Sequence, residues 1–208
     1  MCLLADGIVI APWLLRNAGL FGRLIVTTDA AHVFWLGNNP HSNGTYSDQQ
    51  GRRVIGLADP AFVRRIQQAS ELEQHDLFLA DAQRFIREQP AAFARLVLGR
   101  LWAFVWFSPN AGAEYTPQQG TLYRAAYLLL LGLGIAGVAR WWPRAPSAQR
   151  RVALLLLGSV AGLAAAHALT AINLKHRVPL ELLLAVFAAE SLSAGWTRLR
   201  TSVIIWSE

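Results

Sequence analysis

Long apolar runs dominate the second half of the chain, and three of them are long enough to be membrane-spanning helices. They cover residues 122–142, 152–172 and 178–196, and the second contains only three polar side chains. A helix needs about 20 mainly apolar residues to cross the hydrocarbon core of a bilayer. The pattern therefore predicts a mainly α-helical, polytopic membrane protein with about three transmembrane helices in its C-terminal part, residues 122–208.

The N-terminal residues are also apolar but too few to cross a bilayer. They lack the basic start and the small-residue cleavage site of a signal peptide. We therefore expect residues 1–11 to be the end of a truncated transmembrane helix, as in a fragment or a chain with a late start codon.

Residues 12–58 have the composition of a loop region. The β-branched run at 24–28 predicts a short extended segment or strand. Turn-forming residues follow at 37–40 and at Asn43-Gly44, where side chains either tolerate positive φ or fix φ in advance.

The spacing of apolar residues changes to that of amphipathic helices over residues 59–112. Asp59 followed by Pro60 is typical of a helix start, because Asp accepts from free N–H groups and Pro suits the first helical position. Ser70 and Glu73 have the spacing of a capping box that would start a second helix.

The last part of this region, residues 91–107, is apolar with Arg95, Arg100 and several aromatics. Such side chains suit the headgroup boundary of a membrane. The stretch is either an interfacial helix or a short span, and an interfacial helix gives a consistent topology.

The chain is strongly basic, with a formal net charge of +6. Residues 12–121 hold ten arginines and nine acids, whereas nine basic and three acidic residues follow them. The excess therefore flanks the apolar runs and forms no face suited to nucleic acid. The single cysteine excludes an internal disulfide and a cysteine-based metal site.

Four arginines and no acid lie in residues 140–151, between the first two apolar runs. The positive-inside bias places this loop in the cytoplasm. The next loop, at residues 173–177, then faces the opposite side. The large loop region before residue 121 lies on the same side of the membrane as residues 173–177, provided that residues 91–107 do not cross the membrane.

The most specific polar cluster is Lys175-His176-Arg177, which contains the only lysine of the chain. Ammonium and guanidinium groups both bind phosphate, the latter in bidentate geometry. Two interpretations stay open: a site for a lipid phosphate, or a flank that anchors two helices to headgroups. Glu181 lies four residues after Arg177 and is expected to pair with it.

Three stretches, in this order and spacing, resemble a known family. They are PWLLRN with FWLGNNP near the start, the region from SELEQHDLF to VWFSP in the middle, and HRVPL at 176–180. Together they resemble the C-terminal part of the GT-C superfamily glycosyltransferases that use lipid-linked sugars. These include the protein O-mannosyltransferases (glycosyltransferase family 39 type) and the bacterial aminoarabinose transferase of lipid A.

The resemblance implies a many-helix fold with an outward-facing site and a polyprenyl-phosphate sugar as donor. The acidic catalytic residue of the family lies in an N-terminal loop without a counterpart here, so no catalytic residue is assigned. Donor-phosphate binding is expected from Arg177 first, then Lys175 and His176, although family members often carry Arg-aromatic-Arg there.

The outer-loop motifs of the family match four further residues. They are expected to shape the loop and one wall of the acceptor cavity: Arg16, Asn17, Asn38 and Asn39. No metal ligand and no cofactor are assigned, and the metal requirement stays open.

The sequence thus predicts a C-terminal fragment of a glycosyltransferase in a bacterial inner membrane, with its large loop extracytoplasmic. It would take part in sugar transfer from polyprenyl phosphate to a hydroxyl of a lipid, glycan or protein, and would be inactive alone. Its partners would be membrane lipid and these substrates, not nucleic acid. The alternative is a non-catalytic membrane assembly module or a decayed gene product.

Overall fold

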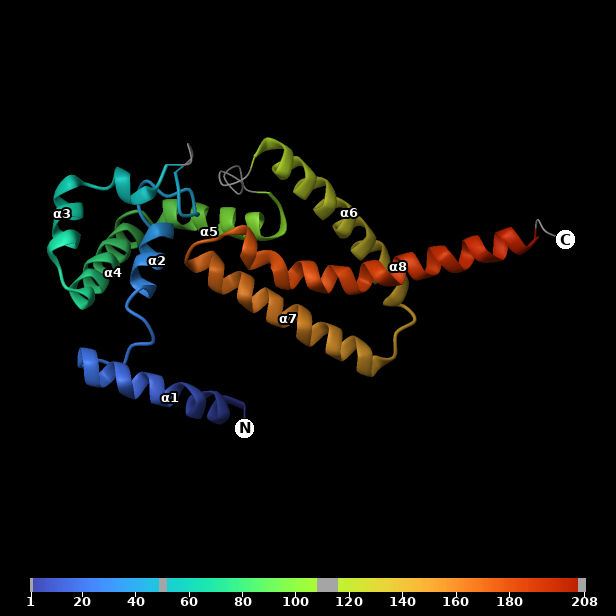
Figure 1. Ribbon diagram of the computed structural model, residues 1–208, viewed down its shortest axis with the longest axis horizontal. Helices are drawn as coiled ribbons and strands as arrows, with labels where there is room; N and C mark the ends of the chain where they lie inside the picture. Colours follow the sequence, from blue (N-terminus) through green and yellow to red (C-terminus); the bar gives the residue numbers. More distant parts are fainter. Residues whose placement is uncertain (1, 49–51, 108–115, 206–208) are drawn as a thin grey trace. The chain divides into compact units, whose positions relative to one another are not determined.

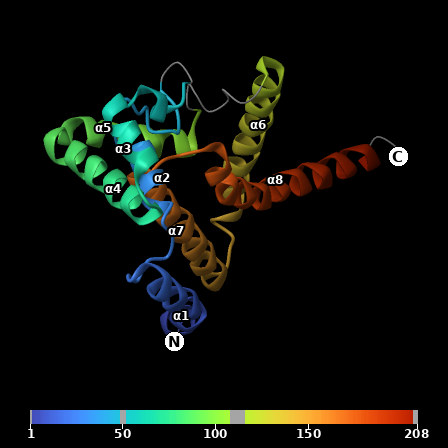
Figure 2. The same ribbon diagram turned by 60° about the vertical axis from the view of Figure 1, so that its left-hand side comes forward.

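The computed structural model describes the backbone of residues 2–48, 52–107 and 116–205, without the side chains of residues 2–6, 174 and 194–205. These residues form eight α-helices and two short 3-10 helices, and none of them lies in a β-strand (Figure 1, Figure 2). The predicted helical fold is confirmed for this part of the chain. The chain divides into two compact units, Met1–Leu96 and Val97–Glu208.

The first unit contains α1 (Cys2–Phe21), α2 (Ala30–Gly37), η1 (Val54–Leu57), α3 (Pro60–Gln68) and α4 (Glu71–Glu88), and α5 (Pro90–Val105) begins in it. The predicted helix starts are confirmed. The Asp59 carboxylate accepts from the backbone N–H of Ala61 over 2.9 Å. Glu73 accepts from the backbone N–H of Ser70 over 2.8 Å, as in a capping box.

Helix α1 runs through Pro12, so the predicted change from helix to loop after residue 11 is wrong. Proline removes one N–H donor and often bends or ends a helix, but here the helix continues. The helix ends instead before Gly22, whose φ of 67° is a left-handed conformation that glycine adopts without strain. The Gly22 N–H donates to the Ala18 carbonyl over 2.9 Å.

The strand allowed by the β-branched run at 24–28 does not form. Two side chains of α1, one turn apart, bind the carbonyls of this irregular segment instead. Trp13 Nε1 donates to the Val26 carbonyl over 2.6 Å, and Asn17 Nδ2 donates to the Ile25 carbonyl over 2.8 Å. Side chains of a helix thus supply the hydrogen bonds that a neighbouring strand would have supplied.

An aromatic cluster forms the core of the first unit. Trp35 of α2 stacks on Phe62 of α3 with ring centroids 5.6 Å apart, and its ring lies 5.2 Å from that of Phe78 in α4. The Trp35 indole N–H donates to the Asp81 carboxylate over 2.8 Å, which satisfies the one polar atom of the ring. Smaller apolar side chains complete the buried set: Ala31, Val54, Ile66 and Ala82.

The second unit contains the end of α5 together with α6 (Pro117–Trp141), α7 (Ser147–Leu169), η2 (Leu174–Arg177) and α8 (Val178–Ile205). Helices α6 and α8 cross in close contact, whereas α7 meets α8 at η2 and diverges from it toward the N-terminus of α7 (Figure 1, Figure 2). A Cβ added at Gly137 of α6 would collide with the backbone carbonyl of Phe187. The absence of a side chain at Gly137 therefore allows the two helix backbones to approach.

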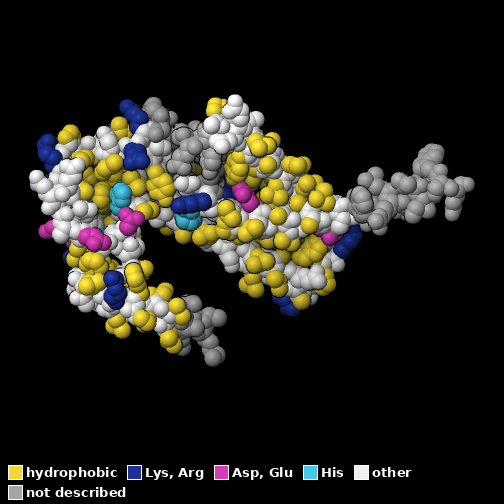
Figure 3. Space-filling view, in the orientation of Figure 1, with side chains coloured by type: hydrophobic (Ala, Val, Ile, Leu, Met, Phe, Trp, Pro, Cys, Tyr) yellow, Lys and Arg dark blue, Asp and Glu magenta, His cyan; other side chains and the backbone are white. Residues whose placement is uncertain are grey.

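Helices α6 and α7 are long and apolar enough to cross a membrane. Only 17% of the apolar window of α6 and 11% of that of α7 is buried, whereas the core helix of a soluble protein is mostly buried. Leu129 is 65% exposed and Leu155 72%. Apolar side chains also cover much of the visible face of the second unit (Figure 3). Exposed apolar surface of this extent marks a contact with lipid or another protein.

The predicted limits of the spans shift by a few residues. The run at 122–142 lies in α6, which begins earlier, at Pro117, and the run at 152–172 corresponds to α7, which ends at Leu169. The third run, 178–196, lies on α8, and its side chains beyond residue 193 are outside the described residues.

Candidate functional site

The turn between α7 and α8 carries the cluster Lys175-His176-Arg177. It is a 3-10 turn, η2, closed by hydrogen bonds between Asn173 and His176. The His176 N–H donates to the Asn173 carbonyl over 3.0 Å, and the His176 Nδ1 accepts from the Asn173 N–H over 3.2 Å. The turn thus has its own local hydrogen bonds before any ligand binds.

Arg177 lies inside the second unit, with 1% of its surface exposed. Its Nε donates to the Glu181 carboxylate over 3.0 Å, and this ion pair confirms the predicted pairing. One terminal nitrogen donates to the backbone carbonyl of Trp106 over 2.8 Å, and the other donates to the Tyr123 hydroxyl. The Tyr123 hydroxyl in turn donates to Glu181 over 2.7 Å, so the three side chains form a closed network.

Aromatic rings surround the same guanidinium. Its central carbon lies 3.8 Å from the ring centroid of Tyr127 and 5.4 Å from that of Phe107. Such cation–π contacts stabilise a desolvated cation by about 2 kcal/mol. Tyr127 is itself fixed, because its hydroxyl donates to the Val105 carbonyl over 2.6 Å.

Arg177 therefore joins the end of α5, α6 and the start of α8. Its three nitrogens all donate to protein groups, and its charge faces the Glu181 carboxylate. A phosphate could reach this guanidinium only after some of these contacts broke. In this structure Arg177 is an architectural residue, and its direct contact with a donor phosphate stays a prediction.

Lys175 and His176 differ from Arg177 in exposure: Lys175 is exposed and His176 half-buried. The His176 ring stacks on that of His167 with centroids 3.7 Å apart. Burial, with smaller contributions from the charges of His167 and Lys175, lowers the pKa of His176 to about 4. His176 is thus neutral near pH 7, and Lys175 is the accessible cation of the cluster.

Arg100 is the second buried arginine of this unit, with 1% of its surface exposed. The expectation that it reaches toward the headgroups is wrong. Its guanidinium donates to the Ala168 carbonyl at the end of α7 over 2.7 Å. The last carbonyls of a helix carry partial negative charge, which a cation stabilises. Burial lowers the pKa of Arg100 to about 10, so it stays charged at neutral pH.

The outer-loop residues belong to the first unit and serve two separate local structures. Arg16 donates to the Asn17 side chain over 3.2 Å, and its guanidinium lies 5.1 Å from the Trp13 ring. Asn38 and Asn39 are buried at the end of α2, where both donate to α2 carbonyls. Asn17 and the Asn38-Asn39 pair thus hold backbone in place, and an acceptor wall formed by them stays a prediction.

Sequence reasoning missed Tyr123 and Tyr127, which form much of the wall around Arg177. The available signal was their four-residue spacing, which puts both on one face of a helix. It also missed the close approach of α6 and α8 at Gly137. For metal binding, the described residues contain no group of three or more His, Cys, Asp or Glu side chains that could hold an ion.

Comparisons with known proteins find no match to this chain among family models, curated proteins or solved structures.

Proposed function

We propose that the chain is the C-terminal, donor-phosphate-binding part of a membrane glycosyltransferase that uses a polyprenyl-phosphate sugar. It would lie in a bacterial inner membrane as a multi-pass protein, with η2 and the loop region of the first unit outside the cytoplasm. The sugar would pass to a hydroxyl of a lipid, glycan or protein. Sugar transfer would need an acidic catalytic residue outside the three stretches that resemble the glycosyltransferase family.

One observation carries the proposal: the exposed Lys175 lies in a turn that the buried Arg177 holds in place. Lys175 lies in η2, and the backbone two residues later is held by the contacts of Arg177 with α5, α6 and α8. A cation on an ordered turn needs little rearrangement to bind an anion, which favours binding. The exposed apolar surfaces of α6 and α7 support a membrane location, where the available anions are lipid phosphates.

The geometry divides the roles within the cluster. Lys175 would contact the donor phosphate and stabilise the negative charge that develops on it when the sugar leaves. Arg177 would hold the turn in place, and the neutral ring of His176 would pack against His167. This division differs from the family-based expectation, which places Arg177 first.

The test is binding of a polyprenyl-phosphate sugar to the detergent-solubilised chain, comparing wild type with Lys175→Ala and Lys175→Arg. A hydrogen bond to a charged group contributes about 1.5–3 kcal/mol, so Lys175→Ala should weaken binding about tenfold or more. Lys175→Arg should retain most of the affinity. Because Lys175 is exposed, neither substitution should alter the thermal transition of the protein.

Arg151→Ala is the matched control, since Arg151 is also exposed but lies at the opposite end of α7. A loss of affinity confined to Lys175→Ala supports the proposal. Equal affinities of all four proteins, or no measurable binding by the wild type, would overturn it.

The complete set of protein partners around Arg177 favours one rival, a non-catalytic membrane module in which the cluster only joins helices. This rival predicts that no lipid-linked sugar binds and that, of the three residues in the cluster, only Arg177 destabilises the protein when substituted.

A further inference from the structure

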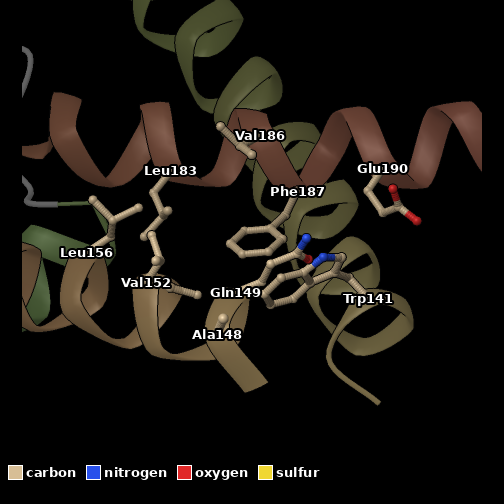
Figure 4. A pocket seen from close by; sticks show the side chains of 10 residues that line it. Trp141, Ala148, Gln149, Val152, Leu156, Leu183, Val186, Phe187 and Glu190 are labelled. Atoms are coloured by element: carbon tan, nitrogen blue, oxygen red, sulfur yellow. The ribbon is translucent and has the colours of Figure 1, made fainter. Parts of the chain in front are cut away.

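An apolar groove opens between α7 and α8, at the end of α7 away from η2. Its volume is about 470 Å³, within the range of about 300–1,000 Å³ typical of ligand sites. The lining is mainly aliphatic and aromatic, as Figure 4 shows: Trp141, Val152, Leu156, Leu183, Val186 and Phe187. The groove exists because α7 diverges from α8 in this direction.

The connection between α6 and α7 borders one end of this groove. Trp141 and Gln149, which line it, directly follow Arg140 and directly precede Arg150 in the sequence. The short connection between α6 and α7 also contains Arg144, so the chain segment that borders the groove is basic. The charged residue in the groove lining itself is an acid, Glu190 of α8 (Figure 4).

Two of these arginines are incompletely bonded. The Nε atoms of Arg140 and Arg150 are buried from solvent and have no hydrogen-bond partner among the described residues. One terminal nitrogen of Arg150 donates to the Pro143 carbonyl over 3.1 Å, which holds its side chain along the connection. A guanidinium held in this way, as at Arg150, suits the oxygen atoms of a phosphate.

We propose that this groove binds an anionic phospholipid of the surrounding leaflet, with an acyl chain between α7 and α8 and the phosphate at Arg140 and Arg150. The charge beside the groove selects the occupant, because Arg140 and Arg150 are sequence neighbours of lining residues and the connection of residues 140–151 contains no acid. Glu190 can accept a hydrogen bond from a headgroup hydroxyl, as in phosphatidylglycerol. The inference rests on the proposed membrane location and not on sugar transfer.

This site is separate from the one at η2. The 23 residues of α7 lie between the two, a length of about 34 Å for a helix that rises about 1.5 Å per residue. With η2 at the outer face, the groove would open to the cytoplasmic leaflet. A structural lipid bound there would fill the space between two helices that make few contacts with each other.

The experiment measures lipid binding to the purified full chain in a mild detergent by native mass spectrometry, with phosphatidylglycerol and phosphatidylcholine of equal chain length. The wild type should bind phosphatidylglycerol about tenfold more tightly, as for one hydrogen bond to a charged group. Arg140→Gln combined with Arg150→Gln should abolish this preference. Val152→Trp, which fills the groove, should weaken binding of both lipids.

Matched controls lie beside each changed residue. Arg151→Gln removes the neighbouring charge, and Leu155→Trp adds the same bulk at a residue of α7 outside the groove lining; both should bind like the wild type. Lys175→Ala should also bind phosphatidylglycerol normally, which separates this result from the test of sugar-lipid binding.

Three outcomes would overturn the inference. They are equal affinity for the two lipids, an unchanged preference in the double arginine variant, and a dimer that Val152→Trp dissociates, which would show a second copy in the groove. If the proposed membrane location itself is wrong, the chain will instead separate with the soluble fraction of detergent-free cell extracts. If Val152→Trp fails to fold, the lipid preference of the double variant Arg140→Gln with Arg150→Gln still tests the inference.

Discussion

The two units of this protein differ in their largest fully buried side chains. The largest fully buried side chain of the first unit is Trp35, whereas those of the second are Arg100 and Arg177. Outside, α3 and α4 of the first unit display charged faces, although α1 exposes apolar side chains, and α7 of the second unit displays a run of exposed leucines at 154–157.

Under the proposed membrane location of α6 and α7, the difference follows from the solvent around each unit. In water, burying apolar surface drives folding, so an aromatic cluster suffices to hold α2, α3 and α4 together. Between helices in lipid this driving force is absent, and close packing at small residues and interhelical hydrogen bonds take its place. The Gly137 crossing and the Arg177 network are such contacts. These contacts fit the proposed membrane location of α6 and α7.

The sharpest way to test this contrast is Arg177→Met, which removes the central cation of the second unit. It leaves Glu181 without its ion-pair partner and should destabilise the protein by about 3–5 kcal/mol, as for one half of a buried pair. Urea unfolding in detergent micelles, followed by circular dichroism, measures the effect. Adding Glu181→Met should recover part of the loss, because the unpaired carboxylate is then gone; a further loss in the double variant would contradict this account.

Trp35→Ala is the corresponding change in the first unit. Loss of a buried aromatic side chain should cost about 3 kcal/mol, from the lost contacts and the cavity left behind. Amide hydrogen exchange should accelerate in α2 and α4, which the tryptophan joins. Trp13→Ala removes the same ring from a half-exposed position and should have a clearly smaller effect; equal effects would show that the aromatic cluster is not the core.

A smaller effect is expected from Gly137→Ala at the crossing of α6 and α8. The added methyl group meets the backbone carbonyl of Phe187, and overpacking of this kind costs about 1–3 kcal/mol. Thermal unfolding in detergent provides the measurement. Gly132→Ala is the control on the same helix, where a Cβ meets nothing within 4 Å. If both variants unfold at the same temperature, close helix packing does not hold this unit.

Much of the local structure followed from short patterns in the sequence. Asp59-Pro60 and the Ser70–Glu73 pair start helices because capping depends on neighbouring residues alone, and the apolar runs at α6 and α7 are helical in the structure. The Arg177–Glu181 pair followed from helical spacing. Local patterns failed at Pro12, where the helix continues, and at residues 24–28, where side chains of α1 took the place of a strand.

What the sequence determined by itself is the mainly helical character, the two long apolar helices and the caps, because each depends on residues within a few positions of one another. Only the tertiary structure decided that Arg177 is enclosed while Lys175 is exposed, that Arg100 caps α7, and that α7 diverges from α8 to open a groove. Those outcomes depend on which helices meet and how closely. The burial of a charge is set by partners such as Trp106 and Tyr123, which lie more than fifty residues away along the chain.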